Sequence, residues 1–243
     1  MSRLDLGRPR DITALFGDSL RAYGRHFVTF LAISVAIVVP VQVAITGIGL
    51  EQLTASYDAS PPAVDAILPA VATYLVVSPL LTAAVLHALR ALASGERPRA
   101  GPALVAAVEA FAPVFFAVVL AALGIAAGLV LIVPGVYLLV RWYFVAPVVV
   151  VEHVGALAAL RRSGELVRGN WWRTLGVLLL TNVAAALPAL VIAVPFDALA
   201  EGAGREAWSL AGSVLAEALV APFTVLVATL LFYDLRVRSV SAA

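Results

Sequence analysis

The sequence contains no cysteine and no lysine, and charged residues of all kinds make up only 13% of it. Without cysteine, the chain forms neither a disulfide nor a thiolate metal site, and covalent haem attachment is excluded as well. Arginine is the only basic residue, which coding bias explains, although arginine also suits planar pairing with lipid phosphate. With so few charges, no folded basic domain offers a groove to nucleic acid, and we expect no nucleic-acid partner.

Hydrophobic residues are abundant instead, at 63% of the 243 positions, and the mean hydropathy is +1.03. These values lie far outside the usual range of soluble domains, so lipid is the expected solvent. Between the apolar runs, no stretch is long enough to bury a core of its own. We therefore expect a single integral membrane domain over residues 1–243, with no soluble catalytic domain. The first apolar run, from Phe27, begins too late and is too long for a cleaved signal peptide.

Six apolar runs are long enough to cross a membrane as helices. About 20 residues of helix cross the hydrocarbon layer, and a helix pairs its own backbone N–H and C=O groups there. The predicted spans are Phe27–Leu50, Ala66–Leu89, Pro113–Val133, Gly135–Val151, Trp172–Pro195 and Trp208–Phe232. The fourth span is short, and Pro134-Gly135 forms a tight turn before it. The predicted fold class is all-α, a polytopic bundle of about six spans with amphipathic interfacial helices.

The distribution of arginine predicts the orientation of the bundle. With these spans, the arginines outside the membrane segments fall on one side, and only Arg205 falls on the other. Since positively charged segments stay in the cytoplasm, both termini are predicted to be cytoplasmic. The longer loops on the opposite side instead contain the acidic residues Glu51, Asp58, Asp65, Asp197, Glu201 and Glu206. We therefore expect a multi-pass protein of the plasma membrane.

Two segments outside the spans show apolar and charged residues on opposite faces of a helix. The first lies within residues 1–26, where apolar side chains recur at helical spacing opposite Asp18 and Arg21. The second is Leu157–Arg168, which ends at Gly169-Asn170. Both are expected to lie flat on the cytoplasmic surface. The predicted divisions of the chain are this N-terminal helix over 1–26, the membrane bundle over 27–234 and a cytoplasmic tail over 235–243.

A repeated pattern accompanies these segments. Arg97-Pro98-Arg99 leads into Ala103–Phe111, much as Arg8-Pro9-Arg10 leads into the first interfacial helix. This pattern predicts three units of surface helix and membrane hairpin, beginning near Arg8, Arg97 and Leu157. The spacings between the units are unequal, and chance similarity of amphipathic segments explains the pattern equally simply.

Two charged residues are predicted to lie within the membrane. By helical rise, Arg141 lies about 10 Å and Glu217 about 14 Å below the outer boundary. An arginine at such depth costs about 2.5–3.5 kcal/mol and normally finds an acidic partner, a phosphate or water. We therefore predict an ion pair between Arg141 and Glu217 that joins the fourth and sixth spans. Such a pair either only fixes helix register or forms a site for a lipid head group or a transported solute; alternatively, Arg141 reaches the interface by itself.

The sequence shows no pattern of a catalytic, cofactor-binding or metal site. It has no P-loop, nucleophile elbow, HExxH motif or glycine-rich dinucleotide fingerprint. Glu152-His153 has no further ligand at metal-binding spacing, so Glu152 is expected to accept hydrogen bonds from Arg161 or Arg162. We predict a protein that is not an enzyme and that holds neither a cofactor nor a metal.

Aromatic and basic residues near the span ends are expected to contact lipid. Amphipathic rings favour the head-group layer, and arginine pairs there with lipid phosphate. The predicted interfacial anchors are Trp142, Tyr143, Trp171 and Trp172. The candidate contacts to anionic lipid or to a partner protein are Arg161, Arg162, Arg168 and Arg173. Separately, Gly124 and Gly128 form a small-xxx-small motif that predicts close helix packing within the chain.

A series of residues in the second half of the chain together resembles a known family. They are Pro134-Gly135-Val136-Tyr137, Arg141-Trp142, Pro147, Glu152, Ala158, Leu160-Arg161-Arg162-Ser163, Leu166 to Trp172, Pro222-Phe223 and Tyr233 to Arg238. This pattern resembles the membrane domain attached to some bacterial glycerophosphoryl diester phosphodiesterases, which also occurs as a stand-alone protein. The resemblance implies an all-helical module of a bacterial plasma membrane that is concerned with lipids or serves a partner protein. It does not imply phosphodiesterase activity, because the soluble metal-binding barrel of those enzymes has no counterpart in this chain.

Two functions from different classes fit these features. The leading hypothesis is a non-enzymatic membrane module whose basic interfacial helices hold anionic lipid head groups or a protein partner. The alternative is a transporter or channel in which Arg141 and Glu217 line a polar path, which the prolines within the spans also favour. A cavity that contains both residues would favour transport.

Overall fold

The structure, a computed structural model, describes residues 5–47, 62–203 and 207–241. The predicted outer-loop residues Glu51, Asp58 and Glu206 lie outside the described residues, as do Arg3 and Arg205. Helices form almost all of the described chain and no strand occurs in it, which confirms the predicted all-α class.

The helices include six segments that are long and apolar enough to cross a membrane, as predicted. In chain order the helices are α1 (Ile12–Arg25), α2 (Phe27–Gly47), α4 (Pro62–Ser94), α5 (Ala100–Leu129), α6 (Val133–Arg141), α7 (Val145–Glu152), α8 (Ala156–Val167), α9 (Trp171–Ala203) and α10 (Ala207–Ser241). The candidate spans lie in α2, α4, α5, α9, α10 and the pair α6–α7. With 33 and 35 residues, α9 and α10 are each about 50 Å long, so they exceed the roughly 30 Å of a hydrocarbon layer.

Three boundaries differ from the prediction. The segment Ala103–Phe111 is not a separate surface helix, because α5 continues through it and through Pro113. The fourth span, predicted as one helix over Gly135–Val151, is divided into α6 and α7 by a turn at residues 142–144. Most of the predicted cytoplasmic tail over 235–243 continues the last span as a helix, since α10 extends to Ser241.

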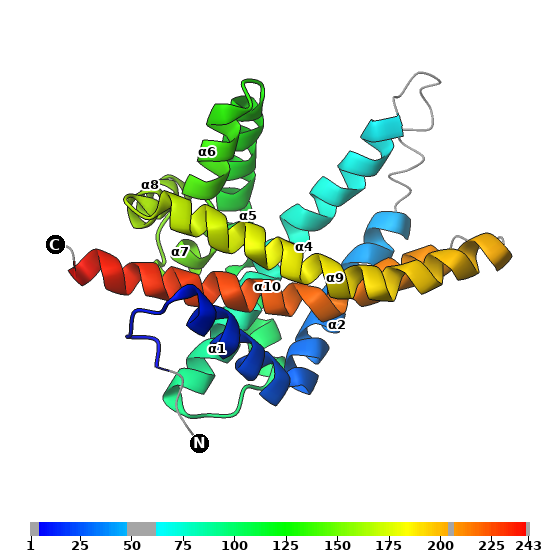
Figure 1. Ribbon diagram of the computed structural model, residues 1–243, viewed down its shortest axis with the longest axis horizontal. Coiled ribbons are helices and arrows are strands. Elements are labelled where there is room, and N and C mark those ends of the chain that lie inside the picture. The colour runs from blue at the N-terminus through cyan, green and yellow to red at the C-terminus, as the bar shows by residue number, and fades with distance from the viewer. Residues whose placement is uncertain (1–4, 48–61, 204–206, 242–243) are drawn as a thin grey trace.

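The spans are arranged as helical pairs that diverge from one end of the molecule. Figure 1 shows α9 and α10 side by side along the longest axis, while α4 and the α5–α6 hairpin project away from them in different directions. In Figure 1, α8 lies beside the last turns of α10, and α1 lies on the other side of α10. We use the name basic end for α1, residues 95–99, α8 and the last turns of α10 from Asp234.

The hydrophobic core lies where the pairs converge on α10. Helix α10, whose Leu226, Leu230 and Phe232 are buried, packs on α9, α2, α1 and α4. By contrast, α9 contacts little besides α10, and its Leu187 and Val191 are 65% and 75% exposed. In a membrane, this face of α9 is the one that meets lipid tails.

Both predicted surface helices form, but they dock on the bundle. The carboxylate of Asp11 caps α1 by accepting a hydrogen bond from the backbone N–H of Ala14 at 2.7 Å. In α1, Leu15 is fully buried and Phe16 packs on Phe223 of α10, with ring centroids 6.3 Å apart. In α8 the buried apolar side chains include Leu160, Leu166 and Val167. The two helices therefore hold the basic end together as well as presenting charge.

The predicted three-unit pattern fits the first and third units. Helix α1 precedes the pair α2–α4, and α8 precedes the pair α9–α10. The second unit has no separate surface helix, because α5 is continuous. An internal repeat therefore stays a prediction.

Candidate functional site: a central cavity and a basic end

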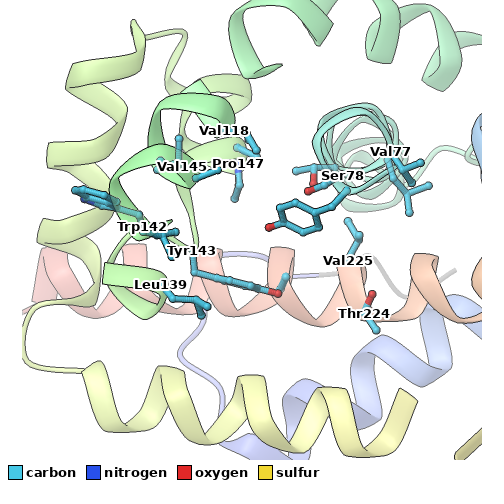
Figure 2. A pocket seen from close by; sticks show the side chains of 18 of the residues that line it. Val77, Ser78, Val118, Leu139, Trp142, Tyr143, Val145, Pro147, Thr224 and Val225 are labelled. Carbon is cyan, nitrogen blue, oxygen red and sulfur yellow. The ribbon is translucent and has the colours of Figure 1, made fainter. Parts of the chain in front are cut away.

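A cavity of about 530 Å³ lies among α4, α5, the α6–α7 segment and α10 (Figure 2). Its wall is mostly apolar, and the hydroxyl groups of Tyr74, Ser78 and Tyr143 are among its few polar groups. Figure 2 shows Tyr143 extending from the α6–α7 turn toward Thr224 of α10. The Thr224 hydroxyl donates to the carbonyl of Ala221 in its own helix at 2.8 Å. Such a cavity suits an apolar molecule with few hydrogen-bonding groups.

Glu217 and Arg141 line different cavities, so the predicted ion pair between them is not formed. Glu217 lines the central cavity and accepts a hydrogen bond from Nε2 of Gln42 in α2 at 2.8 Å. Arg141 lines a smaller cavity beside α8. The prediction failed because helical rise gives the depth of a residue but not the direction in which its side chain leaves the helix.

Arg141 is the last residue of α6 and is held by aromatic side chains. Its Nη1 donates to the hydroxyl of Tyr137 at 3.1 Å, and its guanidinium carbon lies 5.7 Å from the centre of that ring. The Tyr137 ring in turn stacks on Trp171 at 6.2 Å between centroids. Gly164 of α8 leaves room for Arg141, because a Cβ there would lie 2.7 Å from its Nε. Among the described residues, no carboxylate pairs with this guanidinium.

Ser163 of α8 holds the turn between α6 and α7. Its hydroxyl donates to the carbonyl of Arg141 at 2.8 Å and accepts from the backbone N–H of Phe144 at 3.2 Å. Ser163 and Phe144 are both fully buried. A turn in the middle of an apolar segment leaves backbone groups unpaired, and this one side chain satisfies two of them.

The four predicted aromatic anchors separate into two kinds. Trp142 and Tyr143 lie in the turn and point into the bundle, where Tyr143 lines the central cavity. Trp171 packs on Tyr137, and Trp172 is 79% exposed. Trp172 is therefore the member of this set placed to meet lipid, and Trp142 and Tyr143 are packing residues.

The predicted small-xxx-small motif packs α5 against the α6–α7 segment. Gly124 lies directly under the ring of Trp142, and any added Cβ would collide with that indole. Gly128 lies against Gly135, whose backbone nitrogen would be 3.0 Å from an added Cβ. These contacts lie within the chain, as predicted.

Asp234 is a fully buried carboxylate that joins three parts of the basic end. It accepts hydrogen bonds from Nη2 of Arg173 in α9 at 3.1 Å and from Nε of Arg238 at 3.0 Å. It also accepts from the backbone N–H of Arg10 at 2.6 Å. The carbonyl of Arg10 accepts further bonds from Arg173 and Arg238. The N-terminal segment is thus held between α9 and α10 by one acid and two arginines.

Asp18 of α1 forms a second acidic centre next to the first. Arg10, whose side chain is 1% exposed, donates from Nε to Asp18 at 3.0 Å, and Arg8 and Arg21 also pair with it. Burial acts to raise the pKa of Asp18, but the hydrogen bonds from Arg10 and Arg8 and the charges of Arg10 and Arg21 outweigh it, so the pKa lies below its ordinary value. Asp18 therefore remains ionised at neutral pH and fixes Arg10 beside Asp234.

Glu152 at the end of α7 links α8 to α10. It accepts from Nε of Arg162 at 3.1 Å, which confirms one of the two predicted partners, and it pairs with Arg236 at 3.6 Å. Arg162 also pairs with Glu165 at 3.4 Å. The charge of Arg162 is thus already matched within the protein.

The four predicted lipid-contacting arginines therefore differ in what they are free to bind. Arg162 and Arg173 pair with carboxylates, whereas Arg161 and Arg168 are exposed and pair with no carboxylate of the described chain. Three further exposed arginines of the basic end share this property; they are Arg25, Arg97 and Arg99. Burial, together with the charges of Arg25 and Arg97, lowers the pKa of His26 at the α1–α2 junction.

A family model described as "Domain of unknown function (DUF7847)" matches residues 99–235, more than half of the chain. The chain belongs to this family. The DUF7847 region begins at Arg99 and ends at Leu235, so it contains the α6–α7 turn, α8 and the carboxylate of Asp234. Helices α1, α2 and α4 lie outside it.

No curated protein and no solved structure matches the chain. The DUF7847 match covers the half of the chain in which the resemblance to the phosphodiesterase membrane domains was found, but it shows no link to those proteins. What is shown is membership of a family of unknown function.

Sequence reasoning missed Asp234, Asp18 and Ser163 as organising residues. One signal was present for Asp234, because an acid four residues before Arg238 favours a helical ion pair. No sequence signal connects Ser163 with the turn at 142–144, since that contact depends on how α8 folds back.

Proposed function

We propose that this protein is a non-enzymatic integral membrane protein that binds anionic lipid at its basic end. The observation that supports the proposal is the set of exposed arginines of the basic end with no carboxylate partner in the described chain: Arg25, Arg97, Arg99, Arg161 and Arg168. They come from α1 and from two connections between spans, namely residues 95–99 and α8. Each arginine near an anionic membrane surface contributes about 1 kcal/mol of attraction.

The proposed setting is a bacterial plasma membrane with the basic end in the cytoplasmic leaflet. The positive-inside rule supports this orientation, because in the predicted topology the arginines outside the spans, except Arg205, lie on the side of the chain ends. The resemblance to the membrane domain of glycerophosphoryl diester phosphodiesterases supports a role connected with lipids or with a partner protein. Neither the activity nor the substrate of those enzymes is part of the proposal.

The transporter hypothesis requires Arg141 and Glu217 to line one polar path. These two residues line separate cavities instead. The central cavity does contain Glu217, but that carboxylate is bonded to Gln42 and faces a mostly apolar wall. We therefore do not propose transport.

The lipid proposal is tested by spin-label spectroscopy on protein reconstituted in phosphatidylcholine. Spin-labelled phosphatidylglycerol should associate with the wild type several-fold more strongly than spin-labelled phosphatidylcholine, and high salt should reduce the difference. Replacing Arg25, Arg97, Arg99, Arg161 and Arg168 together with glutamine should bring the ratio of the two association constants close to one.

The matched control is Arg205→Gln, which removes a charge predicted to lie on the other side. This variant should keep the selectivity of the wild type. Equal association of both lipids with the wild-type protein would contradict the proposal.

A further inference from the structure

Two cavities beside α6 share part of their lining, and we call them together the groove. The polar cavity, about 130 Å³, is lined by Arg141, Arg168, Gly164 and Gly169, among others. The apolar cavity, about 560 Å³, is lined by Val133 and Val136 of α6 and by Trp172 of α9. Tyr137 and Trp171 line both cavities, so the two cavities are neighbours at this stacked pair of rings.

The polar cavity presents unmatched positive charge. Neither Arg141 nor Arg168 pairs with a carboxylate of the described chain, and the one hydrogen bond that Arg141 donates goes to the neutral hydroxyl of Tyr137. A guanidinium group has five N–H donors in a planar fork that matches phosphate. An arginine close to the hydrocarbon layer is costly unless an anion accompanies it. Because Arg141 does not pair with Glu217, a phosphate group is the partner whose charge and shape suit its guanidinium.

The local backbone is built to keep this cavity open. Gly164 passes so close to Arg141 that a Cβ would lie 2.7 Å from its Nε. Gly169 has a φ of +80°, which ends α8 and turns the chain into α9, so that Arg168 and Trp171 lie on either side of it. The indole N–H of Trp171 donates to the carbonyl of Tyr137 at 3.4 Å and ties α9 to α6.

The apolar part continues the cavity toward lipid. The tip of the α5–α6 hairpin is entirely hydrophobic, and Val130, Ile132 and Val133 are 82%, 70% and 76% exposed. Such a surface belongs in a hydrocarbon layer, since apolar side chains exposed to water are unfavourable. The groove therefore extends from a site of positive charge into the region of the acyl chains.

We propose that this groove binds one phospholipid with an anionic head group, its phosphate between Arg141 and Arg168 and one acyl chain along α6 beneath Trp172. The inference rests on the proposed function and names one specific lipid site within it. It differs from the exposed arginines in that it combines charge with a shaped apolar groove. A phosphate without acyl chains would fill only the polar cavity.

The test is native mass spectrometry of the full-length protein released from mild detergent, with phosphatidylglycerol as the probe. The wild type should bind one phosphatidylglycerol more tightly than any further copies. Arg141→Gln and Arg168→Gln should each weaken that first binding step by about ten-fold, the size of effect expected for one charge-assisted contact. The control Arg90→Gln removes an exposed charge of α4 outside the groove and should change the first binding step by less than about two-fold.

A second variant tests the apolar part of the groove without changing either arginine. Val136→Trp should fill the apolar groove and weaken binding of phosphatidylglycerol while both guanidinium groups remain. Glycerol 3-phosphate, which has no acyl chain, should compete poorly with the lipid. Competition at concentrations similar to those of the lipid would overturn the proposal in favour of a site for free phosphate.

The failures of the two proposals are distinguishable. If the spin-label selectivity of the wild type is present but Arg141→Gln and Arg168→Gln bind lipid as Arg90→Gln does, the groove proposal is wrong and the basic end still binds lipid. If the wild type shows no preference for phosphatidylglycerol in either measurement, both proposals fail.

Discussion

Replacing Asp234 with asparagine is expected to release the N-terminal segment and to cost about 3–5 kcal/mol of folding free energy, the range for removing one partner of a buried ion pair. Asp234 is fully buried and accepts bonds from Arg173, Arg238 and the backbone of Arg10. Asparagine keeps the shape but removes the charge and turns an amide N–H₂ toward two guanidinium groups. Two positive charges then stay in the protein without their shared anion.

Trypsin cleavage of the Arg10–Asp11 bond measures this release. Arg10 is 2% exposed in the native protein, so cleavage there requires the segment to leave the bundle. In Asp234→Asn the cleavage rate should rise by more than ten-fold, and the midpoint of thermal unfolding in detergent should fall. The control is Glu165→Gln, which breaks an exposed pair with Arg162 and should cost less than about 1 kcal/mol. Similar behaviour of the two variants would show that Asp234 does not hold the basic end.

Ser163→Ala is expected to destabilise the bundle by about 2–4 kcal/mol, because it leaves two buried backbone groups without a partner at about 1–3 kcal/mol each. These groups are the carbonyl of Arg141 and the N–H of Phe144 in the α6–α7 turn. Thermal unfolding in detergent, followed by tryptophan fluorescence, measures the change, since Trp142 lies in the same turn.

Ser213→Ala makes the same chemical change at an exposed position, where the hydroxyl bonds only to Leu210 of its own helix. It should leave the unfolding midpoint nearly unchanged. A loss for Ser163→Ala no larger than that for Ser213→Ala would mean that the turn is stable without its side-chain bonds.

The spans were predictable because hydropathy is a local property of the sequence. A run of about 20 apolar residues identifies a membrane helix without knowledge of its neighbours. The amphipathic period also located α8 to within one residue at each end, whereas α1 begins at Ile12, well inside the predicted range 1–26. The break between α6 and α7 was not predictable in this way, because residues 142–144 contain no charged residue, glycine or proline that would indicate the end of a helix.

The polar contacts were harder to predict because they join residues far apart in the chain. The pair of Glu152 with Arg162 was found because both lie near the same short connection. Arg141 and Glu217 match in charge and in depth, yet they leave their helices in different directions. The contact of Asp234 with the backbone of Arg10 spans almost the whole chain, and it follows only from the docking of α1 on α10.

Lipid binding at the basic end has physiological meaning only if that end faces the cytoplasm, and cysteine accessibility in cells tests this most directly. The chain has no native cysteine, so single probes can be placed without background. Ser94 and Ala158 are exposed near the basic end, whereas Ser60, outside the described residues, and Ala203 lie in the loops predicted to be external. A membrane-impermeant maleimide should label Ser60→Cys and Ala203→Cys in intact cells, and Ser94→Cys and Ala158→Cys only after permeabilisation. Labelling of Ala158→Cys in intact cells would contradict the orientation, and with it the proposal that this end meets the anionic lipid of the cytoplasmic leaflet.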